Sequence, residues 1–423
     1  MTDQHAGGTP PALARELGTF DAVVIGLSAM IGAGVFSAFA PAAESAGSGL
    51  LIGLGIAAVV AYCNAVSSAQ LAAQYPTSGG TYFYGRQRLG DWWGFIAGWG
   101  FVVGKTASCA AMALTFAAYA VDGPEWVQRL VGLAALLLLT TVNYHGITKT
   151  SGLARALVTL TLVALATAVV VVIVGHGSSS TQTGDNGGWS TGGWYGVLQA
   201  AGLLFFAFAG YARIATLGEE VREPRRTIPR AIPIALGITV VVYAVLAVTM
   251  LIAVDPAVVA SSATPLSTAV SAVGADWAVW VVRFGAIAAS LGALLALVAG
   301  VGRTGLAMAR HGDLPRWLDA IHPRYQVPHR AEVALAAVVG ALVLTADLRG
   351  VIGFSSFGVL IYYAVANASA FTQTGEYRRW PRLVHVVGLV GCLALVSTLP
   401  LSAVVTGLGL FAVGLLGRAL SRR

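Results

Sequence analysis

Long apolar runs separated by short polar segments dominate the chain from residue 20 to residue 417. Most runs approach the roughly 20 residues that an α-helix needs to cross a bilayer. The segments between them are rich in Gly, Pro, Asp and Arg, which favour turns and helix ends. The pattern predicts twelve membrane-spanning helices, at 20–40, 50–73, 93–120, 130–144, 153–175, 194–217, 228–253, 276–302, 331–346, 350–371, 383–399 and 401–417.

Composition supports an all-α integral membrane protein. Of the 423 residues, 57% are hydrophobic and only 10% are charged, whereas about 25% are charged in soluble proteins. Residues 1–18 are polar and the first apolar run is long enough to span, so we expect no cleaved signal peptide. Cys63, Cys109 and Cys392 lie in apolar runs without paired spacing, which gives no signal for a metal site or a disulfide.

The positions of Lys and Arg predict the orientation, because these residues accumulate in cytoplasmic loops. With the N-terminus inside and the spans alternating, 20 of the 25 basic residues fall in inner segments. Topology therefore explains the net charge of +7, and we expect no nucleic-acid partner. The pattern predicts a multi-pass protein of the plasma (cytoplasmic) membrane, embedded in the lipid bilayer, with both termini in the cytoplasm.

The first span carries Gly32 and Gly34 in its middle. Glycine is a poor helix former, and an unwound turn in lipid exposes backbone amide and carbonyl groups that need partners. A span broken at this depth therefore lines a cavity, and the N-terminus of its second half attracts a carboxylate. The alternative is that these small residues only allow two helices to pack closely.

The sixth span contains Gly210 and Arg213 and is a second candidate for an interrupted helix. It follows the first span by five spans. A five-span unit repeated once is inserted the opposite way up, because an odd number of crossings reverses the chain. Glycine-interrupted segments at corresponding positions of two such halves indicate a central transport site.

Four blocks in chain order resemble permeases of the amino acid–polyamine–organocation (APC) superfamily. They are Ile31-Gly32-Ala33-Gly34-Val35-Phe36 in the first span, Pro76-Thr77-Ser78-Gly79-Gly80-Thr81-Tyr82 after the second, Phe206-Ala207-Phe208-Ala209-Gly210 with Glu219-Glu220-Val221-Arg222-Glu223-Pro224 at the sixth, and Leu306-Ala307-Met308-Ala309-Arg310-His311-Gly312-Asp313-Leu314-Pro315 after the eighth.

The resemblance implies a leucine-transporter-like fold and the transport of amino acids or related amines. A cytoplasmic N-terminal arm at 1–18 would precede a first five-helix repeat at 19–175. A second, inverted five-helix repeat would follow at 194–372, and two peripheral helices at 383–418 would complete a single membrane domain.

The resemblance also implies where a substrate binds. Backbone amides of the first break would hold a carboxylate, and carbonyls of both breaks would take an ammonium group. A zwitterion needs donors at one end and acceptors at the other, and two half-helix ends supply both. Phe206 stands where relatives place an aromatic gate, although a core or lipid-facing ring would look the same in sequence. The implied substrate-binding residues are Met30, Gly32, Ala33, Gly34, Phe206, Ala207 and Ala209.

Lys105 lies about twelve residues into the third span, which is about 18 Å along an α-helix. At that depth a lysine does not easily extend its ammonium to the interface, although such snorkelling is the alternative. A lysine held away from water gives up its proton more readily. We therefore expect Lys105 to act as a coupling group or as a substrate contact. We expect Arg213 to pair with Glu219 or Glu220.

The chain departs from the family pattern at positions that bear on the coupling ion. Residues 156–175 of the fifth span contain no charged residue, whereas some proton-coupled relatives carry a lysine there. Ser290 follows Ala289 where sodium-coupled members often show adjacent hydroxyls, and Ala212 stands where relatives often have an acidic residue. No cofactor is expected, and the coupling ion, H⁺ or Na⁺, stays open.

These observations favour a secondary active amino acid transporter that works by alternating access, with no catalytic residues. The chain has no Gly-x-x-x-x-Gly-Lys-Ser/Thr motif for ATP-driven transport. It has no His-Glu-x-x-His and no paired carboxylates in a span, as a membrane-embedded enzyme or metal site would need. An amino acid/polyamine exchanger, a channel and a non-transporting sensor remain alternatives. A charged Lys105 would disfavour cations, so we expect a neutral amino acid; the oligomeric state is not predicted.

Overall fold

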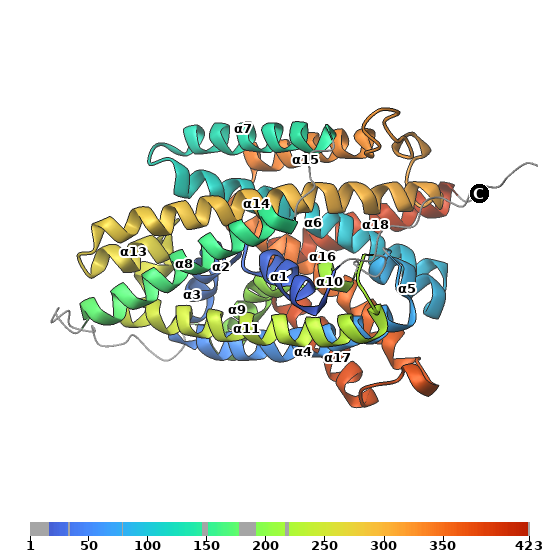
Figure 1. Ribbon diagram of the computed structural model, residues 1–423, viewed down its shortest axis with the longest axis horizontal. Helices are drawn as coiled ribbons and strands as arrows, with labels where there is room; N and C mark the ends of the chain where they lie inside the picture. Colours follow the sequence, from blue (N-terminus) through green and yellow to red (C-terminus); the bar gives the residue numbers. More distant parts are fainter. Residues whose placement is uncertain are drawn as a thin grey trace, which may run out of the picture.

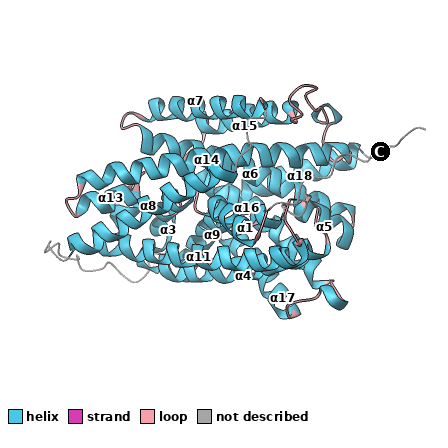
Figure 2. Ribbon diagram, in the orientation of Figure 1, coloured by secondary structure: helices cyan, strands magenta, loops and turns pink. Residues whose placement is uncertain are grey.

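The computed structural model describes residues 17–32, 34–77, 79–145, 151–176, 192–215 and 220–421, and its regular elements are helices (Figure 2). In chain order they are α1 (Thr19–Met30), α2 (Gly34–Ser37), α3 (Phe39–Ala46), η1 (Gly47–Gly49), α4 (Leu50–Gln74), α5 (Gly80–Leu89), α6 (Asp91–Ala120), α7 (Glu125–Tyr144), α8 (Ser151–His176), α9 (Gly193–Phe208), α10 (Ala212–Ala215), α11 (Pro224–Ala253), α12 (Pro256–Ser261), α13 (Pro265–Ala272), α14 (Asp276–Arg310), η2 (Arg316–Leu318), α15 (His329–Thr345), α16 (Leu348–Phe371), η3 (Gly375–Tyr377), α17 (Arg382–Thr398) and α18 (Leu401–Ser421).

The prediction of an all-helical membrane protein is confirmed. Among the described residues, nine helical segments are long and apolar enough to cross a membrane. The other three predicted spans coincide with the shorter helices α9, α15 and α17, and α9 is short because the sixth span is interrupted after Phe208. The eighth span was predicted to end at residue 302, but α14 continues to Arg310, so Arg303 is helical. The limits of the two repeats and of the peripheral pair stay predictions.

Helix α6 runs through the interior between α14 and α16, and the broken helices lie near the middle of the molecule (Figure 1). Glycines bring α6 and α16 together. A Cβ on Gly104 would lie 3.0 Å from the carbonyl oxygen of Ser355, and a Cβ on Gly358 would lie 2.6 Å from that of Gly100. Close packing by small residues, the alternative considered for the first span, therefore does operate between these two helices.

Exposed tryptophans lie at both ends of the bundle: Trp92 and Trp93 at the start of α6 and Trp317 in η2 at one end, and four others at the opposite end. Trp126, Trp194, Trp277 and Trp280 are 58–69% exposed and lie at the first turns of α7, α9 and α14. Tryptophan is enriched at membrane–water interfaces, where its ring is apolar and its N–H is polar. All three helices begin at the face that the charge pattern predicts to be outside, so these side chains fit an outer aromatic belt.

An ion pair joins two segments at that outer end. Arg283 of α14 donates hydrogen bonds to the Tyr119 carbonyl and to the Asp122 carboxylate, which follows α6. The hydrogen bond from Arg283 holds the pKa of Asp122 below its usual range. Arg283, which sequence places inside a span, is therefore near its outer end and has an acidic partner.

Candidate functional site

The first span is interrupted between Met30 and Gly34. Helix α1 ends at Met30, where the Ile31 amide still donates to the Leu27 carbonyl at 2.7 Å, and α2 begins at Gly34. The last carbonyls of a helix have no amides from a following turn, so they need other donors when the end is buried. Ala33, one of the predicted site residues, lies outside the described residues.

The sixth span is interrupted as well. Helix α9 ends at Phe208, α10 begins at Ala212, and the residues between them form turns. The Ala209 amide donates to the Phe206 carbonyl at 3.4 Å, a tighter turn than that of an α-helix. The two spans that were expected to be interrupted thus both lose regular helical hydrogen bonding near their central glycines.

The two breaks lie against each other, and two glycines allow the contact. A Cβ on Gly210 would lie 2.3 Å from the carbonyl carbon of Ala29, and a Cβ on Gly34 would lie 2.9 Å from the Cα of Ala207. These neighbours are backbone atoms, so rotation of a side chain cannot relieve the overlap. The glycines are therefore required by the approach of two backbones and not only by the unwinding of each helix.

Phe206 lies at this junction. Its ring approaches within 3.6 Å of the position that a Cβ on Gly34 would take, and the residue is 7% exposed. The ring therefore faces the interior between the breaks and not the lipid. Whether it opens and closes during transport stays a prediction.

The carbonyl of Ala209 accepts hydrogen bonds from two helices. Lys105 Nζ of α6 and the Tyr363 hydroxyl of α16 each lie 3.3 Å from the Ala209 oxygen. Lys105 is only 8% exposed, so its ammonium points into the interior and does not reach the interface. The lysine singled out in sequence thus contacts the second break directly.

A tyrosine joins the carbonyls of both breaks. The Tyr243 hydroxyl of α11 lies 2.6 Å from the Met30 oxygen and 3.0 Å from the Ala207 oxygen. Neither Tyr243 nor Tyr363 was identified from sequence. The available signal was weak: a tyrosine buried in an apolar helix needs a hydrogen-bond partner, but sequence does not say which one.

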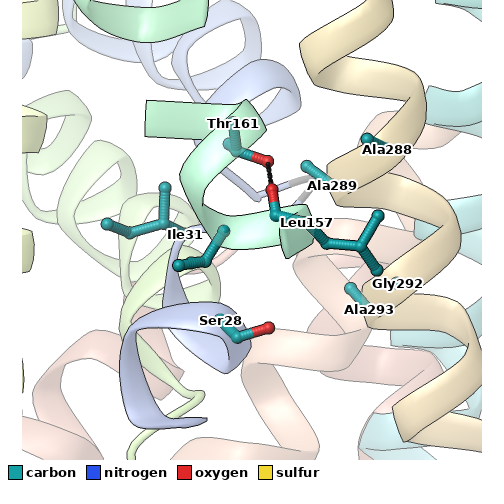
Figure 3. Close-up of a pocket in the computed structure, with 9 residues that line it drawn as sticks. Ser28, Ile31, Leu157, Thr161, Ala288, Ala289, Gly292 and Ala293 are labelled. Carbon is teal, nitrogen blue, oxygen red and sulfur yellow. Dashed lines mark hydrogen bonds between the residues drawn. The ribbon is translucent and has the colours of Figure 1, made fainter. Parts of the chain in front are cut away.

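A small cavity lies beside the first break, between α1, α8 and α14 (Figure 3). Two hydroxyls reach its wall, and that of Thr161 donates to the Leu157 carbonyl at 2.8 Å. Helix α14, which forms one side of the cavity, also carries Ser290. The Ser290 hydroxyl is buried and has no hydrogen-bond partner in the described part of the chain. The lining side chains are uncharged: Ser28, Ile31, Leu157, Val158, Thr161, Ala288, Ala289, Gly292 and Ala293.

Charged residues gather beside α10, which follows the second break. Arg213 of α10 interacts electrostatically with Glu220, one of the two partners expected from sequence, and with Arg303 of α14. Glu219, the other expected partner, lies outside the described residues. Arg213 therefore lies between the second break and these charged groups.

Comparison with known proteins agrees with the family resemblance seen in the sequence. A family model described as amino acid permease matches residues 17–412. A protein described as an uncharacterized transporter of Mycobacterium tuberculosis is 58% identical over 96% of this chain and 91% of its own length. The branched-chain amino acid permease BcaP of Bacillus subtilis is 26% identical over 84% of this chain and 80% of its own. Human cationic amino acid transporter 4 is 29% identical over 85% of this chain and 59% of its own.

Proposed function

Because the chain belongs to the amino acid permease family, we propose that it is a secondary active transporter of neutral amino acids that works by alternating access. Membership makes it a multi-pass membrane transporter and not an enzyme. The observation that supports the finer proposal most directly is the contact between the two interrupted spans, at Gly34–Ala207 and Gly210–Ala29.

The substrate carboxylate would bind at the first break. Backbone amides at Gly32 and Gly34, with Ala33 between them, stand where the chain re-enters a helix. Amides at such a start carry partial positive charge and point along the helix axis. They favour an anion in a site that offers little water to solvate one.

The substrate ammonium would bind carbonyls of the breaks. Those of Met30, Ala207 and Ala209 accept hydrogen bonds from protein side chains, so they are oriented toward donors. A carbonyl oxygen has two lone pairs, so at Met30 and Ala207, where Tyr243 is the side-chain donor, an ammonium can share the acceptor. At Ala209, whose oxygen accepts from both Lys105 and Tyr363, the ammonium would take the place of one of these donors. The carbonyl of Phe206, which accepts from the Ala209 amide, completes the proposed set.

Lys105 favours a neutral side chain on the substrate. Its ammonium lies 3.3 Å from the Ala209 oxygen, so a substrate side chain that carries a charge in addition to the α-ammonium would add a third positive group to the site. Like charges repel strongly where the dielectric constant is low. Among the relatives named above, BcaP of B. subtilis is described as a branched-chain amino acid permease, which is the chemistry that we propose here.

We expect leucine, isoleucine or valine to stabilise the purified protein, because a ligand that binds the folded state shifts the unfolding equilibrium. At a ligand concentration of 100 times Kd the gain is about 2.7 kcal/mol. A thermal-shift screen of the twenty amino acids measures this. Counterflow of the labelled hit in liposomes then separates a saturable carrier from a channel or a sensor. Stabilisation by arginine and lysine alone would contradict the neutral substrate and favour a cationic carrier.

We expect Lys105→Ala to lower gradient-driven uptake by about tenfold, the range in which a buried charged hydrogen bond contributes. If Lys105 is the coupling group, uptake also loses its dependence on pH while counterflow persists. If Lys105 is a substrate contact, uptake of arginine rises relative to leucine. Ser108→Ala, one turn away on α6, is the matched control. An unchanged rate and pH profile in Lys105→Ala would exclude both roles, and a parallel series in Na⁺ and in choline identifies the ion.

We place the protein in the plasma membrane with both termini in the cytoplasm. The excess of basic residues in the inner segments supports this orientation.

A further inference from the structure

Tyr243 occupies a position between the two breaks that no other described side chain shares. Its hydroxyl lies within hydrogen-bond distance of one carbonyl from each interrupted span, Met30 at 2.6 Å and Ala207 at 3.0 Å. The residue is 1% exposed. It belongs to α11, an unbroken helix that packs against α1.

Packing fixes the ring that carries this hydroxyl. Phe208 lies 5.0 Å away, centroid to centroid, and Phe39 lies 6.3 Å away in an edge-to-face arrangement. One turn earlier on α11, the Thr239 hydroxyl lies 3.8 Å from the Met30 sulfur. Phe208 belongs to α9 of the interrupted sixth span, and Phe39 belongs to α3, which follows the second half of the interrupted first span. The ring is therefore held by one element that its hydroxyl joins and by the helix next to the other.

The hydroxyl has one proton and faces two acceptors. It either shares this proton between the two carbonyls in a three-centre hydrogen bond, which joins the spans, or donates fully to one of them, which leaves the other carbonyl for another donor. The shorter distance favours Met30 as the acceptor, which leaves the Ala207 oxygen facing the junction. A rotation about the C–O bond of the phenol exchanges the two.

We propose that Tyr243 is a positioning residue that ties the two interrupted spans together and sets which of their carbonyls is open to a substrate ammonium. The part of this proposal that concerns the substrate ammonium rests on the proposed amino acid transport. The other part, that Tyr243 ties the two breaks together, does not depend on any substrate. An approaching ammonium takes the carbonyl that the hydroxyl leaves free, and the hydroxyl keeps the other one satisfied.

The test is Tyr243→Phe, which keeps the ring and removes only the hydroxyl. Tyr362→Phe is the matched control: Tyr362 is also a buried tyrosine, on α16, and its hydroxyl accepts from the Thr81 amide away from the breaks. Two quantities are measured on both variants and on the unmodified protein in detergent or liposomes. They are the KM and maximal rate of amino acid uptake, and amide hydrogen exchange in the peptides covering 27–36 and 205–212.

We expect Tyr243→Phe to raise KM by about tenfold, because an unsatisfied buried carbonyl destabilises the site by the amount of a lost hydrogen bond. We expect amide hydrogen exchange to accelerate in both peptides together. Without the hydroxyl the two breaks open locally more often, and exchange measures that opening. Tyr362→Phe should change neither quantity by more than about threefold.

Unchanged exchange in both peptides would overturn the tie. Accelerated exchange with an unchanged KM would overturn the role toward the ammonium. If the unmodified protein takes up no amino acid, the proposed transport fails, and the exchange measurement still decides whether Tyr243 joins the breaks.

Discussion

Replacing Gly210 with alanine is expected to lower transport by about 100-fold or more. The added methyl would lie 2.3 Å from the carbonyl carbon and oxygen of Ala29 and 2.6 Å from the Met30 amide nitrogen. Overpacking of an interior usually destabilises by about 1–3 kcal/mol when side chains can adjust. Here the obstacle is backbone, so the two breaks must move apart and the proposed site opens with them.

The measurement is uptake in liposomes at equal amounts of folded protein, checked by size-exclusion profile. Gly237→Ala is the matched control, because a Cβ at that glycine of α11 has nothing within 4 Å. We expect it to transport normally and to be slightly more stable, as alanine favours helix over glycine. If Gly210→Ala does not fold, Gly34→Ala tests the same contact from the other break. Normal transport in both break variants would contradict the close approach.

Replacing Asp313 with asparagine is expected to destabilise the protein by about 3–5 kcal/mol, the range for removing one partner of a buried ion pair. Asp313 follows α14, and its carboxylate is fully buried. It pairs with Arg86 at 2.9 Å and with Arg418 at 3.0 Å, and it accepts the Tyr82 hydroxyl at 2.8 Å. Burial, followed by this hydrogen bond, raises the pKa of Tyr82.

The expected loss is large because the Arg418 charge that remains cannot reach water, whereas Arg86 is partly exposed and keeps Asp91 as a partner at 2.8 Å. The Arg418 side chain is fully buried and lies over the rings of Trp92 and Phe95, at 4.6 and 4.8 Å. The cluster joins α5, α6 and α18 to the segment after α14, so its loss should also loosen the C-terminal helix.

Unfolding in detergent, followed by heat or denaturant, measures the effect of Asp313→Asn. Asp319→Asn is the control: its pair with Arg310 is half exposed, and such pairs contribute about 0–1 kcal/mol. Equal losses in the two variants would show that burial of the Asp313 cluster adds nothing to stability.

Local patterns predict the helices of this protein well and its contacts poorly. Each apolar run is helical, with a break in the first and in the sixth, because hydropathy over about 20 residues reports on the solvent around a segment. The end of α14 was misplaced: Arg303 and Arg310 resemble loop residues in sequence, but their helix continues past the apolar run. Glycines are a second example, because in sequence those at breaks cannot be told from those in intact helices. Gly32, Gly34 and Gly210 lie at the breaks, whereas Gly100, Gly104 and Gly358 lie in intact helices that pack closely.

The sequence by itself determined the class of protein, the order of its spans, the two spans that are interrupted and the family to which the chain belongs. Only the tertiary structure decided what the interruptions face. The carbonyls of Met30, Ala207 and Ala209 receive donors from Lys105, Tyr243 and Tyr363. Those donors come from three helices distant in the chain, and helix packing, which hydropathy does not encode, brings them to one point.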